Sequence, residues 1–221
     1  MYWVFLTSAL IVSYLAGSVN FAIVVATAAR RTDIREVGTR NPGTANVGRN
    51  MGRGWGALVF FGDVAKAIVP LVIAEQAYFP LTGIPGTAGL VLMGMAVILG
   101  HRKPLFFGFR GGGGLATTLG VLGFFAPLEL GISMLFGFGL GMVLFRNKKL
   151  KLGRWVAMLI ILIAPLVALL FSLLVDVPIA GRVSLGGLEW YRVLGMGVLV
   201  VYIVASNGKA VLATARGDPQ T

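Results

Sequence analysis

The sequence has no cysteine, only one histidine and few charged residues. Without cysteine the chain has no disulfide and no thiolate metal site, and a single histidine leaves almost no ligand for zinc. We therefore expect no metal and no other cofactor. Charged residues make up 12% of the 221 residues, against about 25% in soluble domains. Hydrophobic residues make up 57% and the mean hydropathy is +0.88, so the composition predicts a single integral membrane domain over residues 1–221.

The formal net charge of the chain is +11. In a soluble protein this charge would suggest nucleic-acid binding. In so apolar a chain, an excess of lysine and arginine in cytoplasmic loops explains the charge better, so we expect a lipid bilayer and no nucleic acid as partner. Residues 1–6 carry no charged side chain, which argues against a cleaved signal peptide and favours a retained first span that runs to Ala29.

The apolar segments predict an all-α bundle of about seven transmembrane helices. A span takes about 20 apolar residues, and four segments with tryptophan at or near their start are clear spans: 3–29, 55–79, 155–175 and 190–205. Three shorter apolar segments follow one another between the second and third of these: 87–100, 115–126 and 130–145. Pro127 and Glu129 mark a turn, so the part 115–145 is expected to be two short helices or a re-entrant hairpin.

The basic residues predict the orientation of the bundle. Sixteen of the 19 lysines and arginines lie in four segments: 30–53, 102–110, 146–154 and 209–216. Loops rich in lysine and arginine stay on the cytoplasmic side of a membrane. We therefore expect the N-terminus outside and the C-terminus in the cytoplasm, an arrangement that seven helices satisfy.

Two of these cytoplasmic segments carry groups that suit a phosphate. The first loop (residues 33–49) places arginines, hydroxyls and amides between glycines, and guanidinium forks and exposed backbone N–H groups bind phosphate. The second loop (residues 100–118) has four glycines directly before an apolar helix, whose N-terminus offers N–H donors and the positive end of the helix dipole. The alternatives are a solvated basic loop that sets topology and a flexible linker.

Three titratable residues in or beside the apolar segments are candidates for a structural or functional role. Asp63 and Lys66 are three residues apart in the second predicted span, so they share a helix face. Charges at that depth are paired or functional, and a mutual ion pair facing the bundle is the simpler interpretation. His101, the only histidine, is a candidate general base or phosphate ligand, with a structural role as the alternative.

Together the two loops resemble the bacterial acyl-phosphate:glycerol-3-phosphate acyltransferase family, PlsY. That family carries a first motif similar to D-x-R-x-x-G-S-G-N-P-G-A-T-N-V-x-R, a second similar to G-H-x-F-P-x-F-x-x-F-x-G-G-K-G-V-A-T, and a D-x-x-K in the second span. The residues that match the two loop motifs are Asp33, Arg35, Gly38, Asn41, Pro42, Gly43, Asn46, Val47, Arg49, Gly100, His101, Pro104, Phe106, Phe109, Gly111, Gly112, Gly114, Ala116 and Thr117. Asp63 and Lys66 match the pair in the span, so the resemblance covers nearly the whole chain.

The resemblance implies a reaction and a location. A fatty acyl group moves from acyl phosphate to the 1-hydroxyl of glycerol 3-phosphate, giving lysophosphatidic acid and phosphate, without metal or acyl carrier protein. The implied location is the bacterial plasma membrane, with the loops of the active site in the cytoplasm. The resemblance implies catalytic roles for Thr39, Arg49 and Asn207. It implies phosphate binding by Arg40, Asn41, Asn46, His101, Gly111, Gly112, Gly113 and Gly114.

The first loop and the second loop each depart from the family motif. Thr39 stands for the serine, Arg40 for the glycine after it, and Thr44-Ala45 for Ala-Thr. Gly113 stands for the lysine of G-G-K-G. We hypothesise that Arg40 replaces the lost positive charge, although arginine and lysine are not interchangeable. The alternative is an Arg40 side chain that points into solvent.

The C-terminal segment departs further. The family carries H-x-x-N followed by a basic residue and later a glutamate, and here Val204 stands for the histidine, Asn207 and Lys209 remain, and the glutamate has no counterpart. A catalytically degenerate paralogue that binds phosphorylated lipid precursors or a partner enzyme is therefore an alternative, and a small lipid transporter is a third. Acyl-chain length and oligomeric state are not predicted.

Overall fold

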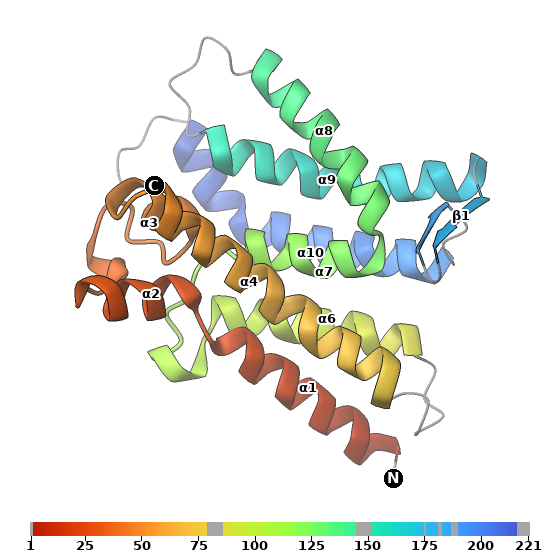
Figure 1. The fold of residues 1–221 in the computed structure, drawn as a ribbon, viewed down its shortest axis with the longest axis horizontal. Helices are drawn as coiled ribbons and strands as arrows, with labels where there is room; N and C mark the ends of the chain where they lie inside the picture. The colour runs from red at the N-terminus through yellow and green to blue at the C-terminus, as the bar shows by residue number, and fades with distance from the viewer. Residues whose placement is uncertain are drawn as a thin grey trace. The chain divides into compact units, whose positions relative to one another are not determined.

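The computed structural model describes residues 2–78, 86–144, 152–174, 176–180, 183–186 and 190–215, and most of them are helical (Figure 1). In this part of the chain, five helical stretches are long and apolar enough to cross a membrane: Trp3–Arg30, Arg53–Gln76, Ala88–Phe107, Pro127–Leu144 and Trp155–Leu174. Two shorter apolar helices cover Leu115–Phe125 and Arg192–Gly208. These stretches overlap the seven predicted segments, and the predicted helical membrane fold is confirmed. The chain divides into two units, residues 1–121 and 122–221.

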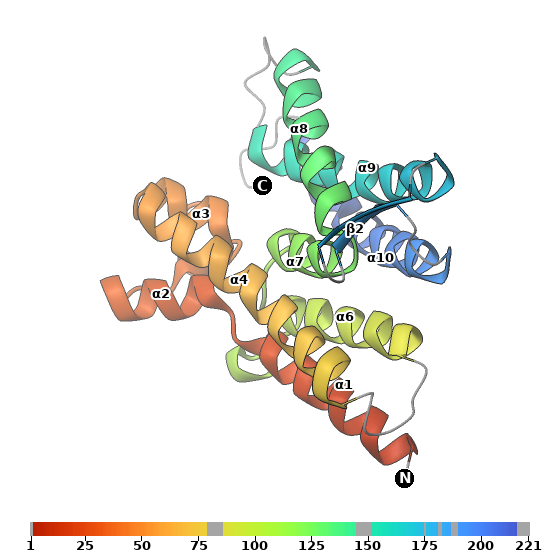
Figure 2. The same ribbon diagram turned by 45° about the vertical axis from the view of Figure 1, so that its right-hand side comes forward.

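The first unit contains the two loops. Its helices are α1 (Tyr2–Ser18), α2 (Phe21–Arg30), the 3₁₀ helix η1 (Ile34–Glu36), α3 (Thr44–Asn50), α4 (Arg53–Ile73), the π-helix η2 (Ala74–Tyr78), α6 (Gly86–Arg102), the 3₁₀ helix η3 (Leu105–Phe107) and most of α7 (Leu115–Phe125). Helix α1 packs against α6 and α4, and α2 and α3 pack against α4. Figures 1 and 2 both draw α2 and α3 at the same end of α4.

The first predicted span is not one helix, because it breaks at Val19 and Asn20. Asn20 is fully buried, and its Oδ1 accepts a hydrogen bond of 3.2 Å from the Ile23 N–H. This is the N-cap interaction that satisfies a free N–H group at a helix start. The break therefore ends α1 at Ser18 and starts α2 in a new direction.

Two apolar segments that are short for a bilayer crossing in the sequence form longer helices in the structure. Helix α6 has 17 residues, and α8 (Pro127–Leu144) has 18. Pro127 does not lie in the turn but opens α8, where the N–H that proline lacks would have no helical partner anyway. Helix α7 has only 11 residues. The part 115–145 thus contains two helices that meet at Ala126, and its number of crossings stays a prediction.

The second unit contains α8, α9 (Leu152–Leu174), α10 (Trp190–Ala215) and a short hairpin of β1 (Asp176–Ala180) and β2 (Val183–Gly186). Helix α9 packs against both α8 and α10. The two strands are antiparallel and pair Asp176 with Gly186. They fall in a loop for which the sequence predicts no structure, and they add a small β-hairpin to the predicted all-α fold.

Candidate functional site

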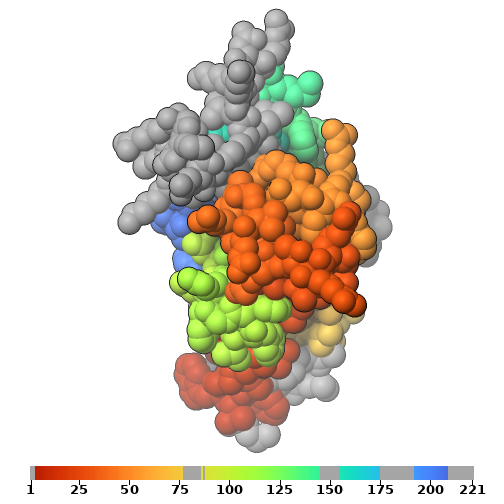
Figure 3. Space-filling model, turned by 90° about the vertical axis from the view of Figure 1, so that its left-hand side faces the viewer, coloured from red at the N-terminus to blue at the C-terminus, as the bar shows by residue number. Residues whose placement is uncertain are grey.

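The first and second loops lie side by side in the first unit. Figure 3 shows them as neighbouring orange and light-green surfaces on one face of the molecule. One direct link runs from the Arg35 Nη1 to the Phe107 carbonyl oxygen, at 2.8 Å. The chain thus brings together two segments that are about 70 residues apart, as a shared phosphate site requires.

Asn46 holds the first loop in shape. Its side chain is buried, and its Nδ2 donates to the carbonyl oxygens of Ile34 (3.1 Å) and Val37 (2.9 Å). Its Oδ1 accepts hydrogen bonds from the Thr39 N–H and from Asn50 Nδ2, both at 3.0 Å. The polar atoms of this side chain are occupied inside the loop, so the geometry suits a positioning residue better than the phosphate ligand expected from the sequence.

Arg35 and Asp33 form the main ion pair of the first loop. Arg35 Nη2 lies 2.7 Å from Asp33 Oδ2, and Arg35 Nε donates to both carboxylate oxygens at 3.0 Å. The side-chain hydrogen bonds from Arg35 hold the pKa of Asp33 below its ordinary value, and the same bonds raise the pKa of Arg35. Asp33 therefore stays ionised at neutral pH and neutralises much of the Arg35 charge.

Lys66 is the centre of a buried cluster that joins three segments. Its ammonium lies 2.8 Å from Asp63 Oδ1, 2.8 Å from the Val19 carbonyl oxygen and 2.9 Å from His101 Nδ1. An ammonium has three N–H donors, which matches these three neighbours. His101 Nδ1 also lies 3.5 Å from Asp63 Oδ1, so the three side chains contact one another. Asp63 and His101 are as deeply buried as Lys66.

The Val19 contact explains the break between α1 and α2. In a continuous helix the Val19 carbonyl would accept an N–H four residues later. At the break it is released, and it accepts from Lys66 instead. The sequence predicted the Asp63–Lys66 proximity from helix spacing, but it gave no sign that Val19 and His101 complete the set.

The glycine run is packed against His101 and Pro42. The Gly112 N–H donates to the His101 carbonyl oxygen at 3.2 Å. A Cβ on Gly112 would press on the Pro42 carbonyl oxygen and lie 2.6 Å from His101 Nε2. The Gly113 carbonyl accepts a hydrogen bond of 2.8 Å from Arg102 Nη1. The Gly112 position thus requires a residue without a side chain, and it connects the second loop with both the first loop and the buried cluster.

Gly114 connects the glycine run to the first turn of α7. It has a φ of +82°, in the left-handed region that favours glycine. Its carbonyl accepts 2.8 Å hydrogen bonds from both the N–H and the hydroxyl of Thr118. Gly112 therefore allows close packing, and Gly114 allows a turn with positive φ.

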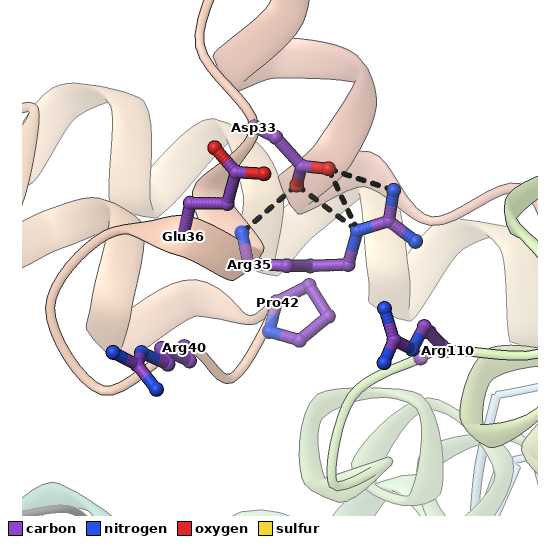
Figure 4. A pocket seen from close by; sticks show the side chains of 7 residues that line it. Asp33, Arg35, Glu36, Arg40, Pro42 and Arg110 are labelled. Atoms are coloured by element: carbon purple, nitrogen blue, oxygen red, sulfur yellow. Dashed lines mark hydrogen bonds and ion pairs between the residues drawn. The ribbon is translucent and has the colours of Figure 1, made fainter.

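An open cavity of about 500 Å³ lies between the two loops (Figure 4). The residues that line it are Asp33, Arg35, Glu36, Arg40, Pro42, Arg110 and Gly111. Three arginines face two carboxylates there, so the lining carries a net charge of +1. A hollow with several guanidinium groups at the surface of a membrane protein suits a small phosphorylated ligand.

The structure places the predicted site residues in different surroundings. Arg40 and Gly111 line the cavity. Thr39 and Asn41 are half-buried in the first loop, whereas Arg49 is exposed on α3, outside the lining set. Asn207 belongs to the second unit, on α10, where its Nδ2 donates to the Ile203 carbonyl at 2.8 Å.

Sequence reasoning missed two features of this site. The sequence indicates Arg110 only as one of the charges that set the topology, whereas the structure places it in the lining of the cavity. The sequence predicts a loop where Thr44–Asn50 forms the seven-residue helix α3, with Gly43 at its N-cap position. Both features depend on how the two loops fold back on each other, which neither loop shows alone.

A family model and several curated proteins match this chain. The model described as glycerol-3-phosphate acyltransferase matches residues 7–214. The glycerol-3-phosphate acyltransferase of Hydrogenovibrio crunogenus is 34% identical over 191 residues, covering 86% of this chain and 79% of that protein. The enzyme of Mycoplasma mobile is 37% identical over 70% of this chain and 63% of that protein. That of Aquifex aeolicus is 44% identical over 51% of this chain and 55% of that protein.

Solved structures match over a larger share of this chain. A crystal structure of PlsY (YgiH), an integral membrane glycerol 3-phosphate acyltransferase, in its glycerol 3-phosphate form has a TM-score of 0.72 and 28% identity, covering 96% of this chain and 92% of that one. A second structure of that protein, in the lysophosphatidic acid form, has a TM-score of 0.70 and 26% identity. These matches agree with the helical membrane fold and with the motifs found in the sequence. The chain therefore belongs to the glycerol-3-phosphate acyltransferase family.

Proposed function

We propose that this protein transfers a fatty acyl group from acyl phosphate to the 1-hydroxyl of glycerol 3-phosphate, giving lysophosphatidic acid and phosphate. The observation that carries the proposal is the cavity between the two loops, with three arginines in its lining, in a chain of this family. Both proposed substrates carry a phosphate group, and the acyl chain of one can remain among the apolar helices.

The reaction needs little chemical activation from the protein. The glycerol 1-hydroxyl oxygen attacks the acyl carbonyl carbon, an ester C–O bond forms, and the bond from that carbon to the phosphate oxygen breaks. The hydroxyl proton passes to the departing phosphate. Because acyl phosphate is already activated, orientation of the two substrates and neutralisation of their charge can supply the catalysis.

We assign roles to the site residues on this basis. Thr39, Arg49 and Asn207 keep the catalytic roles that the family resemblance implies. The phosphate-binding set is Arg40, Asn41, His101, Gly111, Gly112, Gly113 and Gly114, with Asn46 as the residue that positions the first loop. No step in this scheme calls for a metal or an acyl carrier protein.

The test is phosphate release by the detergent-purified protein from an acyl phosphate. We expect release that depends on glycerol 3-phosphate and that produces lysophosphatidic acid, measured by mass spectrometry. Glycerol is the matched control because it has the hydroxyl and lacks the phosphate, and it should not support release. A folded, monodisperse protein that releases no phosphate would contradict the proposal and favour the degenerate paralogue, to which Gly113 and Val204 already point.

We further propose that the protein lies in the bacterial plasma membrane with both loops in the cytoplasm. Support comes from the positive charge of these loops and the rule that such loops stay inside. The opposite orientation would place six arginines between residues 30 and 53 outside.

The absence of cysteine makes this orientation directly testable. Thr32 and Gln76 are both exposed. Thr32 directly precedes the first loop, and Gln76 ends the apolar stretch Arg53–Gln76 that contains α4. In intact cells we expect a membrane-impermeant maleimide to label Gln76→Cys, and to label Thr32→Cys only after the membrane is permeabilised. The reverse pattern would place the loops outside.

A further inference from the structure

The charges that line the cavity are not equivalent. Arg35 is committed to Asp33 and to the Phe107 carbonyl. Arg40 and Arg110 are exposed, and within the described part of the chain their guanidinium groups form no hydrogen bond or ion pair. Each guanidinium has five N–H donors. The cavity lining therefore contains two arginines whose donors are available to a ligand, one from each loop.

The backbone of Arg40 is strained. Its φ is +58°, in the left-handed region, which costs a residue with a side chain about 1–2 kcal/mol. The first loop forces this conformation, because the Arg40 N–H donates to the Val37 carbonyl at 3.1 Å in a tight turn. Glycine would fit without strain, and the motif that this loop resembles has glycine here. No described contact of the Arg40 side chain offsets the cost, and such outliers concentrate at functional sites.

Arg110 approaches the same cavity from the other loop. It directly precedes Gly111, which also lines the cavity. Figure 4 draws Arg40 and Arg110 on either side of Pro42, with Asp33 and Glu36 together on the opposite side of Arg35. Arg40 and Arg110 thus line one cavity from different loops, and the charge of Arg110 also helps to lower the pKa of Asp33.

We propose that Arg40 and Arg110 bind one phosphate group from two sides, as a clamp. Phosphate binding would then explain why an arginine occupies the strained backbone position 40. Two guanidinium forks match the three terminal oxygens of a phosphate. The clamp also gives the site a cation from the first loop where the second loop has Gly113 in place of a lysine. The ligand is a phosphate monoester or an acyl phosphate, and only this identification rests on the proposed function.

The decisive variant is Arg40→Gly, because it removes the guanidinium and relieves the backbone strain together. Its thermal stability should equal or exceed that of the parent, so weaker binding would not reflect misfolding. We expect its Kd for glycerol 3-phosphate, acyl phosphate or both to rise about 10- to 100-fold, as the loss of a charge-assisted hydrogen bond predicts. Titration calorimetry in nanodiscs measures this without turnover, and Arg110→Gln should show a similar rise.

The matched control is Arg31→Gly. Arg31 is also an exposed arginine with positive φ, +50°, but it ends α2 and does not line the cavity. It should leave both Kd values unchanged. Unchanged Kd values in Arg40→Gly and Arg110→Gln, or an equal rise in Arg31→Gly, would overturn the clamp.

The two ligands separate the possible positions of the clamp. A rise for glycerol 3-phosphate alone places the clamp at the acceptor, a rise for acyl phosphate alone places it at the donor, and a rise for both places it where the two phosphates bind in turn. If the parent binds these ligands through Arg40 and yet releases no phosphate, the clamp stands and the proposed acyl transfer fails.

Discussion

Replacing Lys66 with methionine is expected to lower the free energy of unfolding by about 3–5 kcal/mol, as removal of one partner of a buried ion pair does. Methionine keeps the length and apolar stem of the side chain. The variant leaves the Asp63 carboxylate buried without its cation, and it removes the contacts with Val19 and His101. Thermal unfolding of the detergent-purified protein should show a clear loss of stability.

Two further variants isolate the buried charge as the cause. Lys103→Met removes an exposed lysine from the second loop and should leave the midpoint of unfolding unchanged. Adding Asp63→Asn to Lys66→Met removes the stranded carboxylate and should recover part of the loss. The account is wrong if Lys66→Met unfolds at the same temperature as Lys103→Met.

Adding a single methyl group at Gly112 is expected to lower kcat/KM about 100-fold, with the helical content intact. In Gly112→Ala the new Cβ would press on the Pro42 carbonyl oxygen and lie 2.6 Å from His101 Nε2. Backbone cannot yield as a flexible side chain can, so the first and second loops must move apart. Displacements of about 1 Å in a site that works by orientation cost rates of that order.

The control for this substitution is Gly54→Ala. Gly54 is exposed at the start of α4, and a Cβ there would meet no atom within 4 Å. This variant should keep the parental rate and gain slightly in stability, because alanine favours a helix over glycine. Equal rates in Gly112→Ala and Gly54→Ala would show that the contact between the loops does not matter for turnover.

The helices could be predicted because each depends on its own sequence. A run of about 20 apolar residues is helical in a bilayer whatever its neighbours are, since the backbone has no other partner there. The spacing of Asp63 and Lys66 predicted their proximity for the same reason. Asn20 is the one local signal that was overlooked: a polar amide in the middle of a long apolar run is a good N-cap.

The site could be predicted only in its composition. The chemistry of the arginines and glycines in the two loops predicts phosphate binding, but which of these residues share a cavity depends on long-range contacts. The Arg35–Phe107 and Lys66–His101 bonds join residues that are 72 and 35 positions apart. No periodicity encodes such contacts, so the sequence does not show that Arg110 lines the cavity or that the Asn46 side chain is hydrogen-bonded within the first loop.

The three partners of Lys66 also constrain how the chain is made. The Lys66 ammonium contacts Asp63 within its own helix. Its partner Val19 is synthesised before α4, and its partner His101 is synthesised after α4. A charged residue at the centre of a span costs about 2.5–3.5 kcal/mol during insertion, and the contact with His101 becomes available to Lys66 only after α6 has been synthesised. We therefore expect the first three spans to leave the insertion machinery as a group, with the ion pair held until its last partner is synthesised.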